Sequence, residues 1–125
     1  MRRRIALCTI ALALLLAGIA LAANPTKGGT YTGTKAGVIE KKLSLKVAKN
    51  GKTAIANLYC AGKHVSVMKG VVIAKGKFTG RKTLGSSLIW KLKGSFSSST
   101  AAKATATLSA ICDGGRAILN LTLAT

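Results

Sequence analysis

Hydrophobic and polar residues alternate in twos along most of this chain after residue 24. In residues 43–47, Leu-Ser-Leu-Lys-Val, the apolar side chains fall on one face of an extended strand and the polar ones on the other. Residues 90–96, Trp-Lys-Leu-Lys-Gly-Ser-Phe, show the pattern most clearly, with Lys91 and Lys93 opposite the apolar face. The same period predicts strands at 53–60, 65–67, 71–73, 104–110 (with Cys112 on its apolar face) and 117–123. No segment after residue 24 predicts a convincing amphipathic helix.

Turn-forming residues separate these segments. Asn50-Gly51 predicts a two-residue hairpin turn, because both residue types accept a positive φ, and Asp113-Gly114-Gly115 predicts another turn. About eight short strands result. We therefore expect an all-β domain, an antiparallel meander that either closes as a small barrel or folds as a two-sheet sandwich.

A short unit, Gly-x-aromatic-Thr/Ser, occurs three times, in GTYTGTKA (29–36), GKFTGRKT (76–83) and GSFSSSTA (94–101). Glycine permits close approach and curvature, and the ring two residues later lies on the same face of the strand. The unit therefore predicts three equivalent core residues, Tyr31, Phe78 and Phe96, in a chain with two Tyr, two Phe and one Trp. A ligand-stacking triad is the alternative interpretation. We expect the rings to lie on the apolar faces, opposite the lysines.

The first 22 residues are typical of a secretory signal peptide. Arg2, Arg3 and Arg4 precede an apolar run from Ile5 to Ala23, and Ala20-Leu21-Ala22 places small residues before a cut between Ala22 and Ala23. An uncleaved membrane anchor is the alternative, because the run could nearly span a bilayer. We expect a secreted protein whose residues 23–125 form a single domain.

Two cysteines follow the predicted signal segment, Cys60 and Cys112. In an exported chain an even pair predicts a disulfide, worth about 4 kcal/mol in the chain-entropy model. Cys60-x-x-x-His64 leaves a metal site or a catalytic thiol open as alternatives. Zinc, however, takes three or four ligands, and the chain has one His and two acids. We expect no metal and no cofactor.

The charge is extreme: Lys and Arg total 20, Asp and Glu total 2, and the formal net charge is +18. Such a field attracts polyanions, whereas the alternative is a merely soluble surface. Most of the cations are lysines, which act as point charges, so we expect diffuse binding rather than recognition of shape.

Sequence signals of catalysis are weak. Glu40 and Asp113 could form a carboxylate pair in principle, but they are better explained as an ion partner of nearby lysines and a turn residue. His64 lies in a segment, Ala-Gly-Lys-His, that reads as a polar linker, and the chain contains no Gly-x-Ser-x-Gly elbow, phosphate loop or dinucleotide fingerprint. We expect a protein that is not an enzyme, with no catalytic residues.

Three motifs resemble a group of small exported Gly/Lys-rich β-sheet proteins of high-GC Gram-positive bacteria. They are Gly29-Thr30-Tyr31-Thr32-Gly33, Gly76-Lys77-Phe78-Thr79-Gly80 and Cys112-Asp113-Gly114-Gly115. The last strand of such proteins often carries an aromatic residue, where this chain has Leu119 and Leu121. The resemblance implies the fold and an extracellular location but no assigned activity.

Our functional expectation is a monomeric extracellular or cell-surface protein with electrostatic affinity for anionic wall polymers or an anionic membrane surface, without specific recognition of nucleic acid or an identified small-molecule substrate. The expected polyanion-binding residues, which lie on the solvent side of their strands, are Lys42, Lys46, Lys75, Lys77, Lys91 and Lys93. If their strands are neighbours, they form one basic face; lysines along strands also discourage edge aggregation. One alternative is a small-ligand barrel whose cavity is lined by Tyr31, Phe78, Trp90 and Phe96. A weaker alternative is an inhibitor-like module that presents residues 81–87 as a rigid loop.

Overall fold

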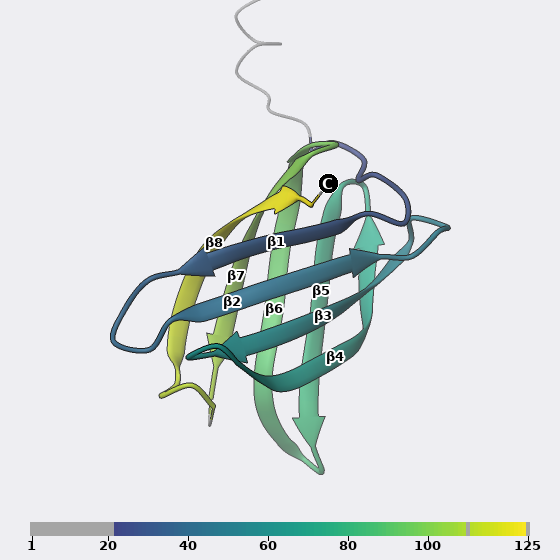
Figure 1. Cartoon of the computed structure of the whole chain (residues 1–125). Helices are drawn as coiled ribbons and strands as arrows, with labels where there is room; N and C mark the ends of the chain where they lie inside the picture. The colour runs from purple at the N-terminus through teal and green to yellow at the C-terminus, as the bar shows by residue number, and fades with distance from the viewer. Residues whose placement is uncertain (1–21, 110, 125) are drawn as a thin grey trace, which may run out of the picture.

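The computed structural model describes residues 22–109 and 111–124 and shows eight antiparallel strands that close into a barrel (Figure 1). The strands are β1 (Thr30–Lys35), β2 (Lys41–Val47), β3 (Thr53–Cys60), β4 (Lys63–Ala74), β5 (Lys77–Leu84), β6 (Ser87–Ser98), β7 (Ala101–Leu108) and β8 (Gly115–Leu123). Each strand pairs with the next along the chain, and β8 pairs with β1. This confirms the all-β meander, and of the two expected architectures it is the barrel.

The apolar side chains that alternate along each strand point into the barrel. On β2, Leu43, Leu45 and Val47 are buried while Lys42 and Lys46 are exposed. An eight-stranded barrel has an interior just wide enough for side chains to fill. In the described residues every fully buried side chain is apolar or aromatic, so the core is held by hydrophobic burial rather than by buried charge.

The repeated glycine–aromatic unit produces one column of rings in this core. Phe96 of β6 lies between Tyr31 of β1 and Phe78 of β5, with ring centroids 5.0 Å and 5.2 Å apart. All three rings are buried, as the sequence predicts. Gly94 shows why the unit begins with glycine: a Cβ there would collide with the Phe78 ring and the carbonyl oxygen of Lys103.

Two ladders of the barrel wall are short, the one between β1 and β8, with two residue pairs, and the one between β4 and β5. The second of them borders the site described below. The β4–β5 ladder contains only the pairs from Val72–Thr79 to Ala74–Lys77, so the first half of β4 and the second half of β5 are not paired with each other. β4 bends away from β5 along this stretch (Figure 1). The indole N–H of Trp90, on β6, donates a 3.0 Å hydrogen bond to Ser66 Oγ on β4, so this bond ties the unpaired part of β4 to β6.

Several local predictions need correction. Residues 65–67 and 71–73 belong to one strand, β4, interrupted by a register shift near Gly70, whose φ is +80°. The Asn50-Gly51 hairpin exists, but its connection runs over residues 48–52, because only Gly51 of the two has a positive φ. His64 lies within β4 rather than in a linker, since Ala61 and Gly62 alone make the β3–β4 turn.

Near the C-terminal end, β7 begins at Ala101, three residues before the predicted start, and ends at Leu108. Cys112 therefore lies in the β7–β8 connection instead of on a strand face. It forms the predicted disulfide with Cys60, with Cα atoms 5.8 Å apart. The bridge ties the end of β3 to the β7–β8 connection. Asp113, Gly114 and Gly115 all have positive φ in this turn.

The segment from Ala22 to Gly29 crosses one end of the barrel before β1 begins. The Ala23 N–H donates to the carbonyl of Phe96 at 2.8 Å, and the Thr26 N–H donates to the Tyr31 hydroxyl at 2.8 Å. The predicted signal peptide, residues 1–22, lies almost entirely outside the described residues. Within the described part, no helix is long and apolar enough to cross a membrane.

Candidate anion-binding site

The outward side chains of β5, β6 and β7 bring five basic residues onto one side of the barrel. Strand register aligns them in three cross-strand rows: Arg81–Lys91–Thr107, Thr79–Lys93–Thr105 and Lys77–Ser95–Lys103. Directly opposed residues of neighbouring strands have Cβ atoms about 5 Å apart, and diagonal neighbours about 7–8 Å. The cations thus lie around short hydroxyl side chains instead of forming an unbroken block.

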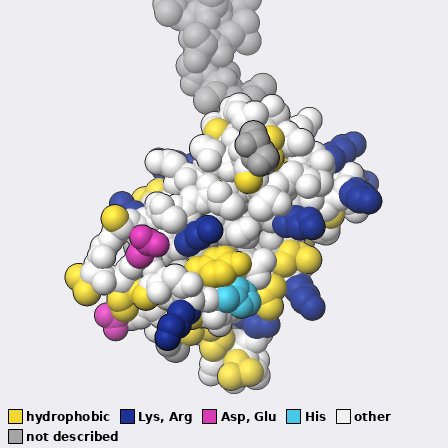
Figure 2. All heavy atoms as spheres, in the orientation of Figure 1, with side chains coloured by type: hydrophobic (Ala, Val, Ile, Leu, Met, Phe, Trp, Pro, Cys, Tyr) yellow, Lys and Arg dark blue, Asp and Glu magenta, His cyan; other side chains and the backbone are white. Residues whose placement is uncertain are grey.

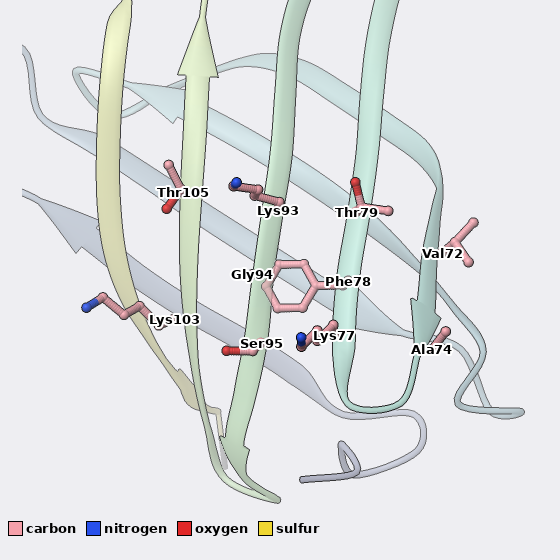
Figure 3. Close-up of a pocket in the computed structure, with 10 residues that line it drawn as sticks. All are labelled: Val72, Ala74, Lys77, Phe78, Thr79, Lys93, Gly94, Ser95, Lys103 and Thr105. Atoms are coloured by element: carbon pink, nitrogen blue, oxygen red, sulfur yellow. The ribbon is translucent and has the colours of Figure 1, made fainter. Parts of the chain in front are cut away.

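These rows enclose a surface hollow of about 580 Å³ (Figure 3). A second hollow, of about 530 Å³, shares Val72, Thr79, Lys93 and Thr105 with it, so the two hollows adjoin. We name the two hollows together the basic groove, with five cationic members: Lys77, Arg81, Lys91, Lys93 and Lys103. The figure shows Lys93 extending from β6 toward Thr105 on β7, over the middle of the groove.

The groove is concave because its floor is made of small residues. Thr79, Ser95 and Thr105 lie between the longer lysine side chains, and Gly94 contributes backbone alone. Val72, which is 53% exposed, and Ala74 form an apolar margin on β4. Hydroxyl groups can donate to anionic oxygens, and the ammonium groups at the rim supply charge-assisted hydrogen bonds.

No acidic side chain lies on the strands of the groove. The chain's two acids, Glu40 and Asp113, lie in the β1–β2 and β7–β8 connections. Arg81 and Lys91 are direct cross-strand partners, an arrangement of like charges that destabilises a sheet. The groove therefore concentrates positive charge at a cost to folding, and an anion bound there would relieve that repulsion.

The six lysines that the sequence predicted to bind polyanions lie in three different parts of the barrel. Lys77, Lys91 and Lys93 are in the groove, whereas Lys75 lies in the β4–β5 turn, with a φ of +54°. Lys42 and Lys46 are on β2, which is four strands from β6 in either direction around the barrel. The six lysines do not form a single face.

Two groove cations, Arg81 and Lys103, were not among the predicted residues. Thr79 and Arg81 are two residues apart and both lie on the outward face of β5, and this period of two was visible in the sequence. Lys103 was missed because the predicted strand began at residue 104, although the outward positions of β7 include it.

Tyr59 contradicts the expectation that every ring lies on an apolar face. It points out of the barrel and is half-buried, because β3 turns Leu58 and Cys60 inward. Its ring centroid lies 5.2 Å from that of His64 and 5.5 Å from Lys42 Nζ. His64 Nε2 is 2.9 Å from Asn57 Oδ1. We call Lys42, Asn57, Tyr59 and His64 the Tyr59 cluster. His64 is the one histidine of the chain, and its side chain is cyan in Figure 2.

The structure gives little support to the alternative functions, which are a small-ligand barrel, an inhibitor-like loop and a catalytic thiol. Tyr31, Phe78, Trp90 and Phe96 are almost completely buried and pack within the barrel, and of these rings only Phe78 borders the groove, from beneath Gly94. Residues 81–87 form the end of the β5–β6 hairpin, with a turn at Gly85-Ser86, rather than a long presented loop. The disulfide occupies both Cys60 and Cys112, so neither is available as a free thiol.

Comparisons with protein-family models, with curated proteins and with solved structures found no match to this chain. The resemblance to exported proteins of Gram-positive bacteria thus stays a prediction.

Proposed function

We propose that this is an exported, non-enzymatic protein that binds anionic polymers outside the cell, such as phosphate- or sulfate-bearing polymers, through the basic groove. The observation that carries the proposal is the pair of adjoining hollows, which are lined by five cations and no acid. Four of the five are lysines, so recognition is of charge density along a chain rather than of one rigid group.

The groove suits a polymer better than a small anion. It extends over two adjoining hollows and crosses β4 to β7, so successive charges of an extended chain can meet successive rows. Binding of this kind releases counterions, and affinity then falls linearly with salt on a log–log plot. Exposed charges are screened within about 8–10 Å at physiological salt, so affinity there depends on several cations acting together.

The test compares two triple variants of equal net charge. One, Lys77→Gln/Lys93→Gln/Lys103→Gln, removes three of the five groove cations; the control, Lys35→Gln/Lys49→Gln/Lys52→Gln, removes three exposed lysines elsewhere. Binding of labelled polyphosphate is measured across a salt series. At about 1 kcal/mol per lysine, the groove variant should bind roughly 100-fold more weakly at low salt. The slope of log binding constant against log salt concentration should become shallower by about 2–3 for this variant.

The control variant should retain most of the affinity and nearly the whole slope. Equal losses in the two variants would contradict the proposal, because they would show that the lysines act as a uniform solvated coat.

A further inference from the structure

Tyr59, which is half-buried, is the one Phe, Tyr or Trp among the described residues that points out of the barrel, and it lies away from the basic groove. On the outward face of β2, β3 and β4, strand register aligns Lys42, Tyr59 and His64 in one cross-strand row. The neighbouring row holds Ser44 and Asn57. An aromatic pair, an ammonium group, an amide and a hydroxyl therefore share one patch of the barrel wall.

Contacts within the patch fix the two rings in place. The Tyr59 and His64 rings are inclined by 60° with centroids 5.2 Å apart, and the bond between His64 Nε2 and Asn57 Oδ1 limits rotation of the imidazole. Asn57 and Tyr59 alternate with inward residues on β3, so both are anchored by a strand whose other face is in the core. The Tyr59 ring is therefore held in place, with the His64 ring tilted beside it, before any flat group stacks on it.

Positive charge follows the same face of β2. Lys42 Nζ lies 5.5 Å from the Tyr59 centroid, and Lys46 is four residues further along the strand, about 13 Å away at the usual rise per residue. Glu40 is the acid at the other end, two residues before Lys42. Lys42 and Lys46 therefore offer an extended polyanion two cationic contacts along β2.

We propose that this wall binds single-stranded nucleic acid, with a base stacked on Tyr59, the His64 ring at the edge of that base, and phosphates beside Lys42 and Lys46. Aromatic residues on an exposed sheet, flanked by cations, are the elements by which proteins hold single strands without reading their sequence. A duplex keeps its bases stacked on one another, so it can use only the charge. The sequence-based expectation of no specific nucleic-acid recognition assumed that every ring lies inward, and Tyr59 removes that assumption.

The first experiment needs no variant. Anisotropy titrations compare a labelled 15-residue oligothymidine with an abasic oligonucleotide of the same length, which has the same phosphates and no bases. The oligothymidine should bind about 5- to 150-fold more tightly, the range that stacking of one base on an aromatic side chain gives. Equal affinities would overturn the proposal, because charge alone would then account for the binding.

Variants then locate the effect. Tyr59→Ala should remove most of the preference for the oligothymidine and leave the abasic affinity unchanged, whereas Tyr59→Phe should keep the preference. A preference that survives Tyr59→Ala would also overturn the assignment. The groove variant Lys77→Gln/Lys93→Gln/Lys103→Gln should weaken both probes equally and leave their ratio unchanged, so this proposal and the proposed function can fail separately.

Discussion

The basic groove and the Tyr59 cluster stand on different sides of one barrel, and both are built from lysines at outward strand positions. They differ in what lies between the lysines. The groove has Thr79, Ser95 and Thr105, whereas the cluster has Tyr59, His64 and Asn57. The inner faces of the same strands are alike, because both must fill one core. In both proposals charge attracts the ligand to the wall, and the uncharged residues between the cations decide which chemistry it meets there.

We expect the largest effect on stability from removing the Cys60–Cys112 disulfide, which links the two sides covalently. The disulfide joins the end of β3, which carries Tyr59, to the connection that follows β7 of the groove. Cys60→Ala/Cys112→Ala should lower the free energy of unfolding by about 2–5 kcal/mol, as measured by urea denaturation. Reduction of the unmodified protein should give a comparable loss. A stability insensitive to both treatments would show that the walls are held together by the core alone.

A smaller loss should follow from a single methyl group on the groove side. Gly94→Ala places a Cβ against the Phe78 ring and the Lys103 carbonyl, and overpacking of this kind costs about 1–3 kcal/mol. Gly37→Ala is the matched control, because the nearest atom to its Cβ would be the Ile39 carbonyl oxygen at 3.7 Å. Thermal unfolding of the two variants should differ accordingly. Equal midpoints would mean that the groove strands yield without loss of packing.

The hydrogen bond that ties β4 to β6 offers a test of similar or smaller size. Ser66→Ala leaves the indole N–H of Trp90 buried without its partner, which costs about 1–3 kcal/mol. The cost should shrink when the substitution is made in a Trp90→Phe background, and a double-mutant cycle monitored by far-UV circular dichroism measures that coupling. Additive losses would show that Ser66 and Trp90 act independently.

The smallest effects should have opposite signs on the two walls. Lys91→Glu replaces a like-charged cross-strand pair with an Arg81–Glu pair and should raise stability by about 0.2–1 kcal/mol. Lys42→Glu instead removes a cation from above the Tyr59 ring and should lower stability by about 0.5–1 kcal/mol. Urea denaturation of both variants in low salt checks the signs. Two shifts of the same sign would indicate that only overall net charge matters.

Much of the fold follows from local pattern. The period of two along 90–96 placed Trp90 and Phe96 inside and Lys91 and Lys93 outside, as the structure has them. The same rule applied to β3 would have placed Tyr59 outside, because Leu58 and Cys60 flank it. Its exposure was thus readable from the sequence, and the general association of aromatic residues with cores concealed it.

The site was harder to predict than the strands. Whether Lys46 and Lys93 share a face depends on which strands are neighbours in the closed ring, and no local pattern states that. The sequence also did not reveal the backbone conformation of Ala61. Its φ of +52° allows a tight turn, but alanine seldom adopts a positive φ. His64 was assigned to a linker for this reason, although it stands beside Tyr59 on a strand.

Under the proposed export, the segment that crosses the end of the barrel would set the order of processing and folding. Ala23 is hydrogen-bonded to Phe96, and Ala22 lies against Gly76, so both sides of the predicted cut are held to the β4–β5 turn and β6. A peptidase requires that backbone free and extended. Processing would therefore come before the barrel closes, and a precursor that folded too early would shield its own cleavage site.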